Sequence, residues 1–217
     1  MRNPAPPPRR PARWPIIPTM MVAAAVATMI ALGIWQLARK GEKEALIALH
    51  QRNIALSSEV TFPELGPVDN AVYFRRSTIT CLEPVTIAPR AGQDAAGRST
   101  YRSIADCRTG AEGPGALVAL GTLPDPARQP LWQGGTVSGI IVPGPDQPSL
   151  LDRLTGRAVP ARALLVADPP VAGWGANARP DPAAQPNNHL AYAVQWFIFA
   201  VAAAAIYVLA LRKRLRV

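Results

Sequence analysis

The sequence has few of the residues with which enzymes usually do chemistry. Its 217 residues include two histidines and two cysteines, and no histidine lies between residues 60 and 168. It also lacks the GxSxG, HExxH, GxxxxGKS and GxGxxG motifs of hydrolases, zinc proteases and nucleotide-binding proteins. No nucleophile with a nearby base and no set of metal ligands is recognisable. We therefore expect a binding or assembly protein rather than an enzyme.

Acidic residues are missing from both ends of the chain. Four arginines and no acid occur in the first fifteen residues, and four cations and no acid occur in the last six. These eight cations account for nearly all of the formal net charge of +9, because residues 38–211 hold fifteen basic and fourteen acidic residues. Proteins that bind nucleic acid carry their basic excess as a patch or stripe on the folded domain. The distribution therefore argues against nucleic acid as a partner.

Charge is also absent from two long apolar runs, residues 16–37 and 190–211. Each run has 22 residues, and a helix of that length spans about 33 Å, enough for a hydrocarbon core of about 30 Å. Two buried core helices are the alternative, but core helices rarely run this long without a charge. A cleaved signal peptide usually ends at a small-x-small site, whereas the first run ends in Gly-Ile-Trp-Gln-Leu. We therefore predict two transmembrane helices and treat the first as an anchor.

The flanking charges predict the orientation of these helices. Cytoplasmic flanks of transmembrane helices are enriched in Lys and Arg, and the cations of this chain lie outside the outer ends of both runs. Both termini are then cytoplasmic, and the residues between the runs lie on the opposite side of the membrane. Trp35, Tyr192 and Trp196 would fall near that far interface, where aromatic residues form a belt.

The predicted chain has five parts. They are a cytoplasmic tail rich in Pro and Arg (1–15), a transmembrane helix (16–37), a mainly β domain on the far side (38–188), a second transmembrane helix (190–211) and a basic cytoplasmic tail (212–217). Residues 38–56 have a helical pattern that could continue the first span, and His50 within them is expected to be a solvated helical residue. The fold class is a membrane protein of α+β type, with two transmembrane helices flanking a mainly β domain.

The middle of the chain has the pattern of short strands separated by Gly and Pro. Candidate strands are residues 72–82, 85–90, 99–108, 116–123, 136–142 and 162–168. About 110 residues in this style predict one compact domain. Residues 168–188 are rich in Pro and would connect this domain back to the membrane.

Both cysteines, Cys81 and Cys107, lie in the predicted β domain. If the chain turns back at a hairpin centred on Asp94, Ile87 would face Tyr101. The two cysteines would then be direct cross-strand neighbours. A disulfide is geometrically possible in that arrangement, and the oxidising side of the membrane would permit it. Two free buried thiols are the alternative, and the absence of CxxC argues against a thiol-redox motif or a zinc site.

The second histidine, His189, stands at the start of the second apolar run. An asparagine at position 187 or 188 would cap a helix there, and on helical spacing His189, Tyr192 and Trp196 share one face. His189 could be an interfacial residue that hydrogen-bonds a lipid headgroup or a loop carbonyl. It could instead be the axial ligand of a haem iron whose ring lies against the helix. Spacing alone leaves both interpretations open.

Two blocks of the sequence carry a family resemblance. The first is LGIWQLAR at residues 32–39, followed by Lys43, which is similar to the pattern LGxWQxxRxxxK. The second is NHLAYAVQWF at residues 188–197, which is similar to NxHLxYAxxWF. Both patterns belong to the surfeit locus protein 1 (Shy1-like) family of cytochrome c oxidase assembly factors. The chain departs from this family in its middle domain, where LVALGTLPD (117–125) stands in place of a VNRGWVP-like turn.

The resemblance implies an inner-membrane assembly factor for haem-copper cytochrome c oxidase, which binds haem a and helps its insertion into subunit I. It implies His189 as the ligand of the haem iron, with Tyr192 and Trp196 packing against the porphyrin. Subunit I is the expected partner and haem a synthase a further candidate, with membrane lipid around the helices. The expected location is a bacterial inner membrane, with the central domain in the periplasm. The alternatives are a structural chaperone that holds an oxidase subunit without haem, and a membrane-tethered enzyme.

Overall fold

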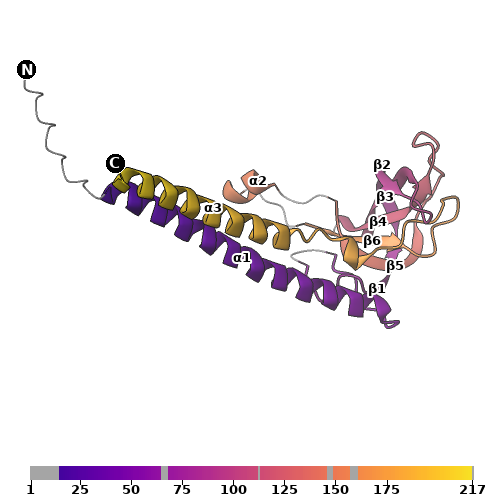
Figure 1. The fold of residues 1–217 in the computed structure, drawn as a ribbon. Helices are drawn as coiled ribbons and strands as arrows, with labels where there is room; N and C mark the ends of the chain where they lie inside the picture. Colours follow the sequence, from indigo (N-terminus) through magenta and orange to yellow (C-terminus); the bar gives the residue numbers. More distant parts are fainter. Residues whose placement is uncertain (1–14, 65–67, 112, 146–148, 157–160, 217) are drawn as a thin grey trace, which may run out of the picture. The chain divides into compact units, whose positions relative to one another are not determined.

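The computed structural model describes residues 15–64, 68–111, 113–145, 149–156 and 161–216 (Figure 1). Residues 1–14 and Val217, which belong to the predicted cytoplasmic tails, lie outside the described residues. The chain divides into two compact units. The helical unit comprises Met1–Glu44 and Pro186–Val217, and the β unit comprises Ala45–Gln185.

The first element, α1 (Ile16–Ala55), is one continuous helix of 40 residues. It continues past the apolar run because the following segment is rich in Ala, Leu, Glu and Lys, all of which favour helices. The ammonium group of Lys40 also pairs with the Glu44 carboxylate one turn later, at 2.6 Å. The segment at 38–56 is therefore helical, as expected, up to Ala55.

The last helix, α3 (His189–Arg216), contains the second apolar run. In both α1 and α3, only 6% of the most apolar 18-residue window is buried within the protein. A core helix of a water-soluble protein would bury most of such a window, so the alternative of two core helices is wrong. Both helices are long and apolar enough to cross a membrane.

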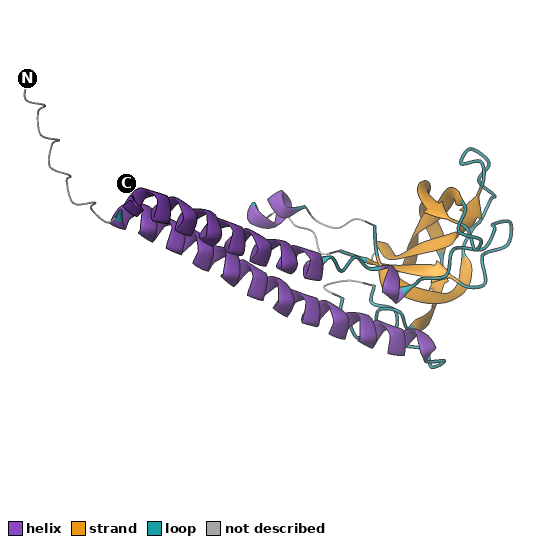
Figure 2. Ribbon diagram, viewed as in Figure 1, coloured by secondary structure: helices purple, strands orange, loops and turns teal. Residues whose placement is uncertain are grey.

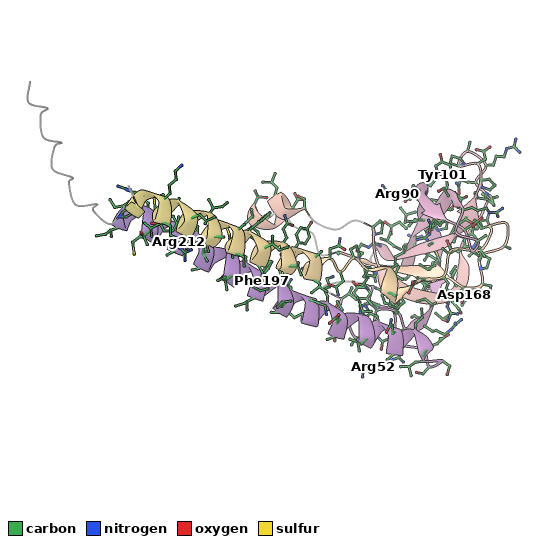
Figure 3. The ribbon with its side chains drawn as sticks, in the orientation of Figure 1. Arg52, Arg90, Tyr101, Asp168, Phe197 and Arg212 are labelled. Atoms are coloured by element: carbon green, nitrogen blue, oxygen red, sulfur yellow. A yellow bond between two sulfur atoms is a disulfide. The ribbon has the colours of Figure 1, made fainter. Side chains whose placement is uncertain are left out.

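Within the helical unit, α1 and α3 run side by side and antiparallel (Figure 2). The hydroxyls of Thr19 and Tyr207 share a hydrogen bond of 2.5 Å near one end of the pair. Further along, a Cβ atom at Gly33 would lie 2.6 Å from the Phe197 ring, so only glycine allows this close approach. Phe197 is labelled in Figure 3 where it projects from α3.

The β unit contains one mixed sheet of six strands. They are β1 (Arg76–Cys81), β2 (Glu83–Gln93), β3 (Ser99–Gly110), β4 (Gly113–Leu123), β5 (Gly135–Pro143) and β6 (Ala163–Ala167). All six candidate strands are present, with their ends shifted by a few residues. The strand pattern did not indicate a short helix, α2 (Leu150–Leu154), or a 3-10 turn, η1 (Pro182–Ala184).

The strands follow the order β1-β5-β6-β4-β3-β2. Neighbouring strands are antiparallel except β4 and β6, which are parallel because a long excursion containing β5 and α2 separates them. Strand β6 lies in the middle of the order, and all five of its residues are buried. Its sequence, ALLVA, is accordingly apolar without alternation.

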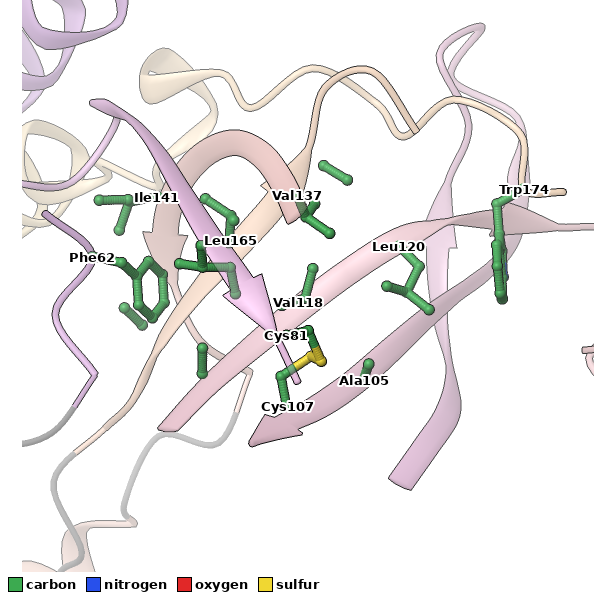
Figure 4. Packing of buried hydrophobic residues seen from close by; sticks show 14 of the residues in the cluster. Phe62, Cys81, Ala105, Cys107, Val118, Leu120, Val137, Ile141, Leu165 and Trp174 are labelled. Atoms are coloured by element: carbon green, nitrogen blue, oxygen red, sulfur yellow. A yellow bond between two sulfur atoms is a disulfide. The ribbon is translucent and has the colours of Figure 1, made fainter. Parts of the chain in front are cut away.

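The sheet curls around its main core, so that β1 meets β3. The N–H of Leu82 donates to the carbonyl of Arg108 at 2.8 Å. A disulfide joins Cys81 to Cys107, with Cα atoms 5.3 Å apart. Figure 4 shows this disulfide among the buried side chains, beside Val118. The core takes side chains from β1, β3, β4, β5 and β6, as a curled sheet requires.

The hairpin register differs from the one predicted. Strands β2 and β3 pair Gln93 with Ser99, so the turn is centred two residues later than expected. Ile87 consequently faces Ala105 and not Tyr101. The predicted cross-strand pairing was therefore wrong in its register.

The turn itself explains the shift. The Oδ1 atom of Asp94 accepts the backbone N–H groups of Ala96 and Arg98, at 2.9 and 3.0 Å. Gly97 then adopts a φ of +76°, a left-handed conformation that glycine takes without strain. These hydrogen bonds hold the pKa of the Asp94 carboxyl below its usual value. Asp94 therefore opens the turn instead of standing at its centre.

The disulfide also forms by a different route from the one predicted. In the hairpin ladder, Cys107 lies opposite Pro84. The chain bends at Leu82, which places Cys81 on the separate strand β1. The bond therefore links two strands that the curl of the sheet brings together, and not the two arms of one hairpin.

Candidate functional site

His189 is the first residue of α3, and its ring is oriented by α1. The Nδ1 atom of His189 lies 2.7 Å from Oε1 of Gln36, within the helical unit. Because a carboxamide oxygen can only accept, Nδ1 is the nitrogen that carries the proton. In the neutral ring, the lone pair then lies on Nε2. In the part of the chain that the structure describes, Nε2 has no hydrogen-bonding partner.

The residues just before the helix complete the surroundings of this ring. The carbonyl of Asn188 accepts the N–H of Tyr192 at 3.2 Å, which makes it the first acceptor of the helix. The Oδ1 atom of Asn187 is buried and has no hydrogen-bonding partner among the described residues. A buried acceptor without a donor is uncommon, and this one lies two residues from the candidate ligand.

The predicted aromatic partners lie on the same helix. Tyr192 is 52% exposed and Trp196 is half-buried, one and two turns after His189. The Trp196 ring makes an edge contact with Phe199, with centroids 6.2 Å apart. On α1, Trp35 precedes Gln36 and is 51% exposed. Exposed or half-buried aromatic side chains therefore occur on both helices, close in sequence to His189 and to Gln36.

Gln36 is the contributor to this site that sequence reasoning missed. It lies inside the block LGIWQLAR, and His189 lies inside the block NHLAYAVQWF. Each block stands at the inner end of its apolar run, so an antiparallel hairpin places the two blocks side by side. The matching position of the two blocks was the signal that could have paired Gln36 with His189.

His50 is not the solvated residue that was expected. It is only 2% exposed and lies within the β unit. Its ring is tilted against the Phe74 ring, with centroids 4.8 Å apart, and meets Tyr73 edge-on at 6.3 Å. The side-chain nitrogen of Gln185 lies 3.1 Å from Nδ1 of His50. The helical pattern could not show this, because the covering residues come from segments distant in sequence.

Asn53, one turn after His50, fixes the same region. It is 5% exposed, and its Nδ2 donates to the carbonyls of Ala71 and Tyr73 at 2.9 and 2.8 Å. Burial raises the pKa of the Tyr73 hydroxyl. Phe74, with a φ of +62°, presents its ring to His50 from a strained backbone conformation. These contacts give His50 and Asn53 a structural role, attaching the end of α1 to the turn that precedes β1.

Other reactive groups do not gather into a second chemical site. Among the described residues, no group of three or more His, Cys, Asp or Glu side chains could hold a metal ion. Cys81 and Cys107 are joined and buried, so neither is a thiol. The half-buried imidazole of His189 is thus the group whose geometry fits the binding of a ligand.

Taken together, these features define a membrane protein of α+β type. Two apolar helices of membrane-crossing length flank a β unit with a disulfide, and a histidine oriented by an amide stands where the second helix begins.

The comparison with protein families identifies the chain more closely. The model of the SURF1 family matches residues 23–201, which include both sequence blocks and the whole β unit between them. The chain belongs to the SURF1 family, as the resemblance predicted. This family serves cytochrome oxidase assembly and is a family of assembly factors, not of enzymes. No curated protein matches the chain.

Proposed function

We propose that this protein binds haem a through His189 and helps its insertion into subunit I of cytochrome c oxidase. The observation that carries the proposal is the hydrogen bond from Nδ1 of His189 to Gln36. Ligating histidines usually donate their second ring nitrogen to a protein oxygen, which fixes the tautomer and aims the free nitrogen at the metal. His189 has this arrangement with Gln36.

The surroundings of His189 fit a porphyrin. Haem iron takes a neutral imidazole as an axial ligand, and the ring needs an apolar or aromatic surface. Tyr192, Trp196 and Trp35 offer such a surface on the two helices. Haem supplies the iron that the imidazole ligates. Holding the haem through one histidine would favour its transfer to another protein over permanent retention.

His50 is unsuited as a second axial ligand. Its ring is 2% exposed and packs on Phe74 and Tyr73. Using it would require the end of α1 to unpack from the turn that precedes β1, which the two hydrogen bonds of Asn53 oppose. The proposed site therefore uses one histidine.

The proposed location is a bacterial inner membrane, with both termini in the cytoplasm and the β unit in the periplasm. Cations cluster outside the outer ends of both apolar runs, and such clusters remain on the cytoplasmic side. The disulfide supports the periplasmic placement, because stable disulfides are typical of oxidising compartments. His189 would then lie at the periplasmic boundary of the bilayer. Haem a synthase is the proposed donor of the haem and subunit I the acceptor.

The decisive experiment measures haem on the purified protein. The full chain is purified from cells that make haem a, and its absorption spectrum is recorded together with that of His189→Ala. We expect a haem band in the parent that is lost in the variant. A band that survives the substitution would remove His189 from the site. A parent protein without any band would favour the structural chaperone that holds an oxidase subunit without haem.

A pair of substitutions at Gln36 tests the orienting role separately. Gln36→Leu removes the acceptor and is expected to lower haem affinity about 10-fold or more. Gln36→Glu keeps an acceptor for Nδ1 and should retain most of the affinity. Haem titration of the purified apo-protein measures both. Equal affinity of the leucine variant and the parent would contradict the proposed role of the hydrogen bond.

A further inference from the structure

We infer that the outer edge of strand β2 binds a partner protein by strand addition, and that the added segment alternates acidic with apolar residues. The partner's backbone would pair with residues 87–91, and its acidic side chains would lie beside Arg102. The inference goes beyond the proposed function, because it concerns the β unit alone and does not depend on haem.

The outer edge of β2 follows from the register of the hairpin. Strand β2 is the last in the sheet order, and residues 86–93 pair with β3 without interruption. In such a ladder, backbone groups point alternately at the neighbouring strand and away from it. The N–H of Asp94 donates to the carbonyl of Arg98 at 3.0 Å, so Asp94 points at β3. The odd-numbered residues before it therefore turn their backbone groups outward, and they include Ile87, Pro89 and Ala91.

The protein's own chain shows that this edge can accept a strand. Near the hairpin turn, the carbonyl of Gln93 accepts the N–H of Ala178 at 3.1 Å. The N–H of Ala95 donates to the carbonyl of Ala176, also at 3.1 Å. Residues 176–178 thus run antiparallel beside the end of β2. These two hydrogen bonds also confirm that the odd-numbered residues of this edge point outward.

The rest of the edge has no such cover. Among the described residues, no segment pairs with the outer side of residues 87–91. This stretch presents the N–H groups of Ile87 and Ala91, and the carbonyls of both residues and of Pro89. A proline is tolerated at position 89 because its nitrogen faces outward and not toward β3. A row of unpaired backbone groups is the template that an added strand needs.

A cation marks one face of this edge. Arg102 of β3 stands opposite Arg90 of β2. Its side chain extends across β2, since a Cβ atom at Gly92 would lie 3.6 Å from the Nε atom of Arg102. In the described part of the chain, that Nε is buried without a hydrogen-bonding partner, and burial lowers the pKa of the guanidinium. Like charges directly opposite each other are unfavourable, so an acidic side chain on an added strand would stabilise the pair.

The other face of the edge is apolar. Ile87 is half-buried against the core, and Tyr101 of β3 is 42% exposed. Tyr101 faces Ala91 across the ladder, and the alanine side chain is too small to cover the ring. Figure 3 labels Tyr101 and Arg90 in the β unit. Because side chains on a strand alternate between its faces, a segment that suits both faces alternates acidic and apolar residues.

A second copy of the protein fits this edge less well. Pairing β2 with another β2 would bring a second Arg90 and a second Arg102 to the same interface. Four arginines in neighbouring strands would repel one another. Charge therefore favours an acidic partner over self-association, and the two differ in how they depend on protein concentration.

The test measures amide hydrogen exchange along β2, residue by residue, in the full chain in mild detergent. The probes are two synthetic peptides with blocked ends, one alternating valine with glutamate and the other alternating valine with lysine. We expect the glutamate peptide to slow exchange several-fold at Ile87 and Ala91, and the lysine peptide to have little effect. The N–H groups of Ala88 and Arg90 point at β3, so their exchange should not change.

Two variants at one position separate the edge from the fold. Ala91→Pro removes an outward N–H without removing a hydrogen bond to β3, and it should abolish the slowing at Ile87. Ala91→Val keeps that N–H and should retain the slowing. Arg102→Gln should weaken the effect of the glutamate peptide several-fold. Near-ultraviolet circular dichroism checks that each variant is folded.

Three outcomes would overturn the inference. The first is unchanged exchange at Ile87 and Ala91 with the glutamate peptide. The second is equal slowing by the lysine peptide, which would contradict the acidic chemistry of the partner. The third is slowing that appears without peptide as the protein concentration rises, which would assign the edge to a second copy.

Discussion

His50 and His189 are the two histidines of the chain, and their surroundings differ in almost every respect. His50 is 2% exposed, packs on two aromatic rings and lies one turn before Asn53, which is hydrogen-bonded to the turn that precedes β1. His189 is half-buried, opens a helix and has its Nδ1 directed at the amide oxygen of Gln36, whereas Nδ1 of His50 faces the amide nitrogen of Gln185. The same side chain thus serves packing in one place and is the proposed haem ligand in the other. Accessibility and the partner of Nδ1 separate the two roles.

The β unit and the helical unit also differ in the contacts that stabilise them. The β unit has a continuous core and a disulfide that joins strands across the curl of its sheet. Among the described residues of the helical unit, no comparable core cluster forms, and its helices meet closely at Gly33 and through polar contacts. Stability should therefore be most sensitive to substitution in the β unit, and ligand binding to substitution in the helical unit.

The largest expected effect on stability comes from removing the disulfide. The Cys81→Ala/Cys107→Ala double variant is expected to destabilise the β unit by about 3–4 kcal/mol, because the bond closes a loop of 26 residues. Denaturant unfolding of the full chain in mild detergent measures the loss. Reduction of the parent protein should reproduce it. An unchanged unfolding midpoint in both cases would show that the curl of the sheet does not depend on the bond.

His50→Ala is expected to have the next largest effect. Losing a fully buried ring that packs on Phe74 should cost about 2–3 kcal/mol. The haem band per folded protein should remain, because His50 lies outside the proposed site. Thermal unfolding and the absorption spectrum measure the two quantities on one sample. Loss of the haem band without loss of stability would reverse the assignment of the two histidines.

Gly33→Ala tests the close approach within the helical unit. The added methyl would lie 2.6 Å from the Phe197 ring, so the helices must shift, at an expected cost of about 1–2 kcal/mol. Gly41→Ala is the control on the same helix, since nothing lies within 4 Å of a Cβ there. Thermal unfolding followed by far-ultraviolet circular dichroism compares the two. Equal midpoints would show that the Gly33 contact is not tight.

His189→Ala should change stability least. The residue is half-buried at a helix start and makes one hydrogen bond, so we expect a change within about 0.5 kcal/mol. Denaturant unfolding of the parent and the variant, both without haem, measures it. A loss as large as that of His50→Ala would mean that His189 also serves packing.

Much of the architecture could be read from residue patterns. The charge-free runs marked both long helices, and Val, Ile and Thr between Gly and Pro marked all six strands. These features were readable because helix and strand periodicity are local properties. The hairpin register was not readable, since Asp94 and Gly97 set the turn two residues later than the expected centre. A turn is decided by which side chain caps which N–H, and composition does not reveal that.

The residues of the candidate site also divide into those that the sequence indicated and those that it did not. His189 and its aromatic neighbours could be named from their spacing and from the two sequence blocks. Gln36 was missed, because its contact with His189 spans 153 positions along the chain and is indicated only by the place of the two blocks in an antiparallel hairpin. The burial of His50 was also hidden, since Tyr73, Phe74 and Gln185 reach it from distant segments.

The sequence by itself determined the apolar runs, the strands, the charges at both ends and the family, because these follow from neighbouring residues and short blocks. Only the tertiary structure decided which strands the disulfide joins, which histidine is buried and which amide orients the other. Those outcomes depend on contacts between residues far apart in the chain, and only packing brings such residues together.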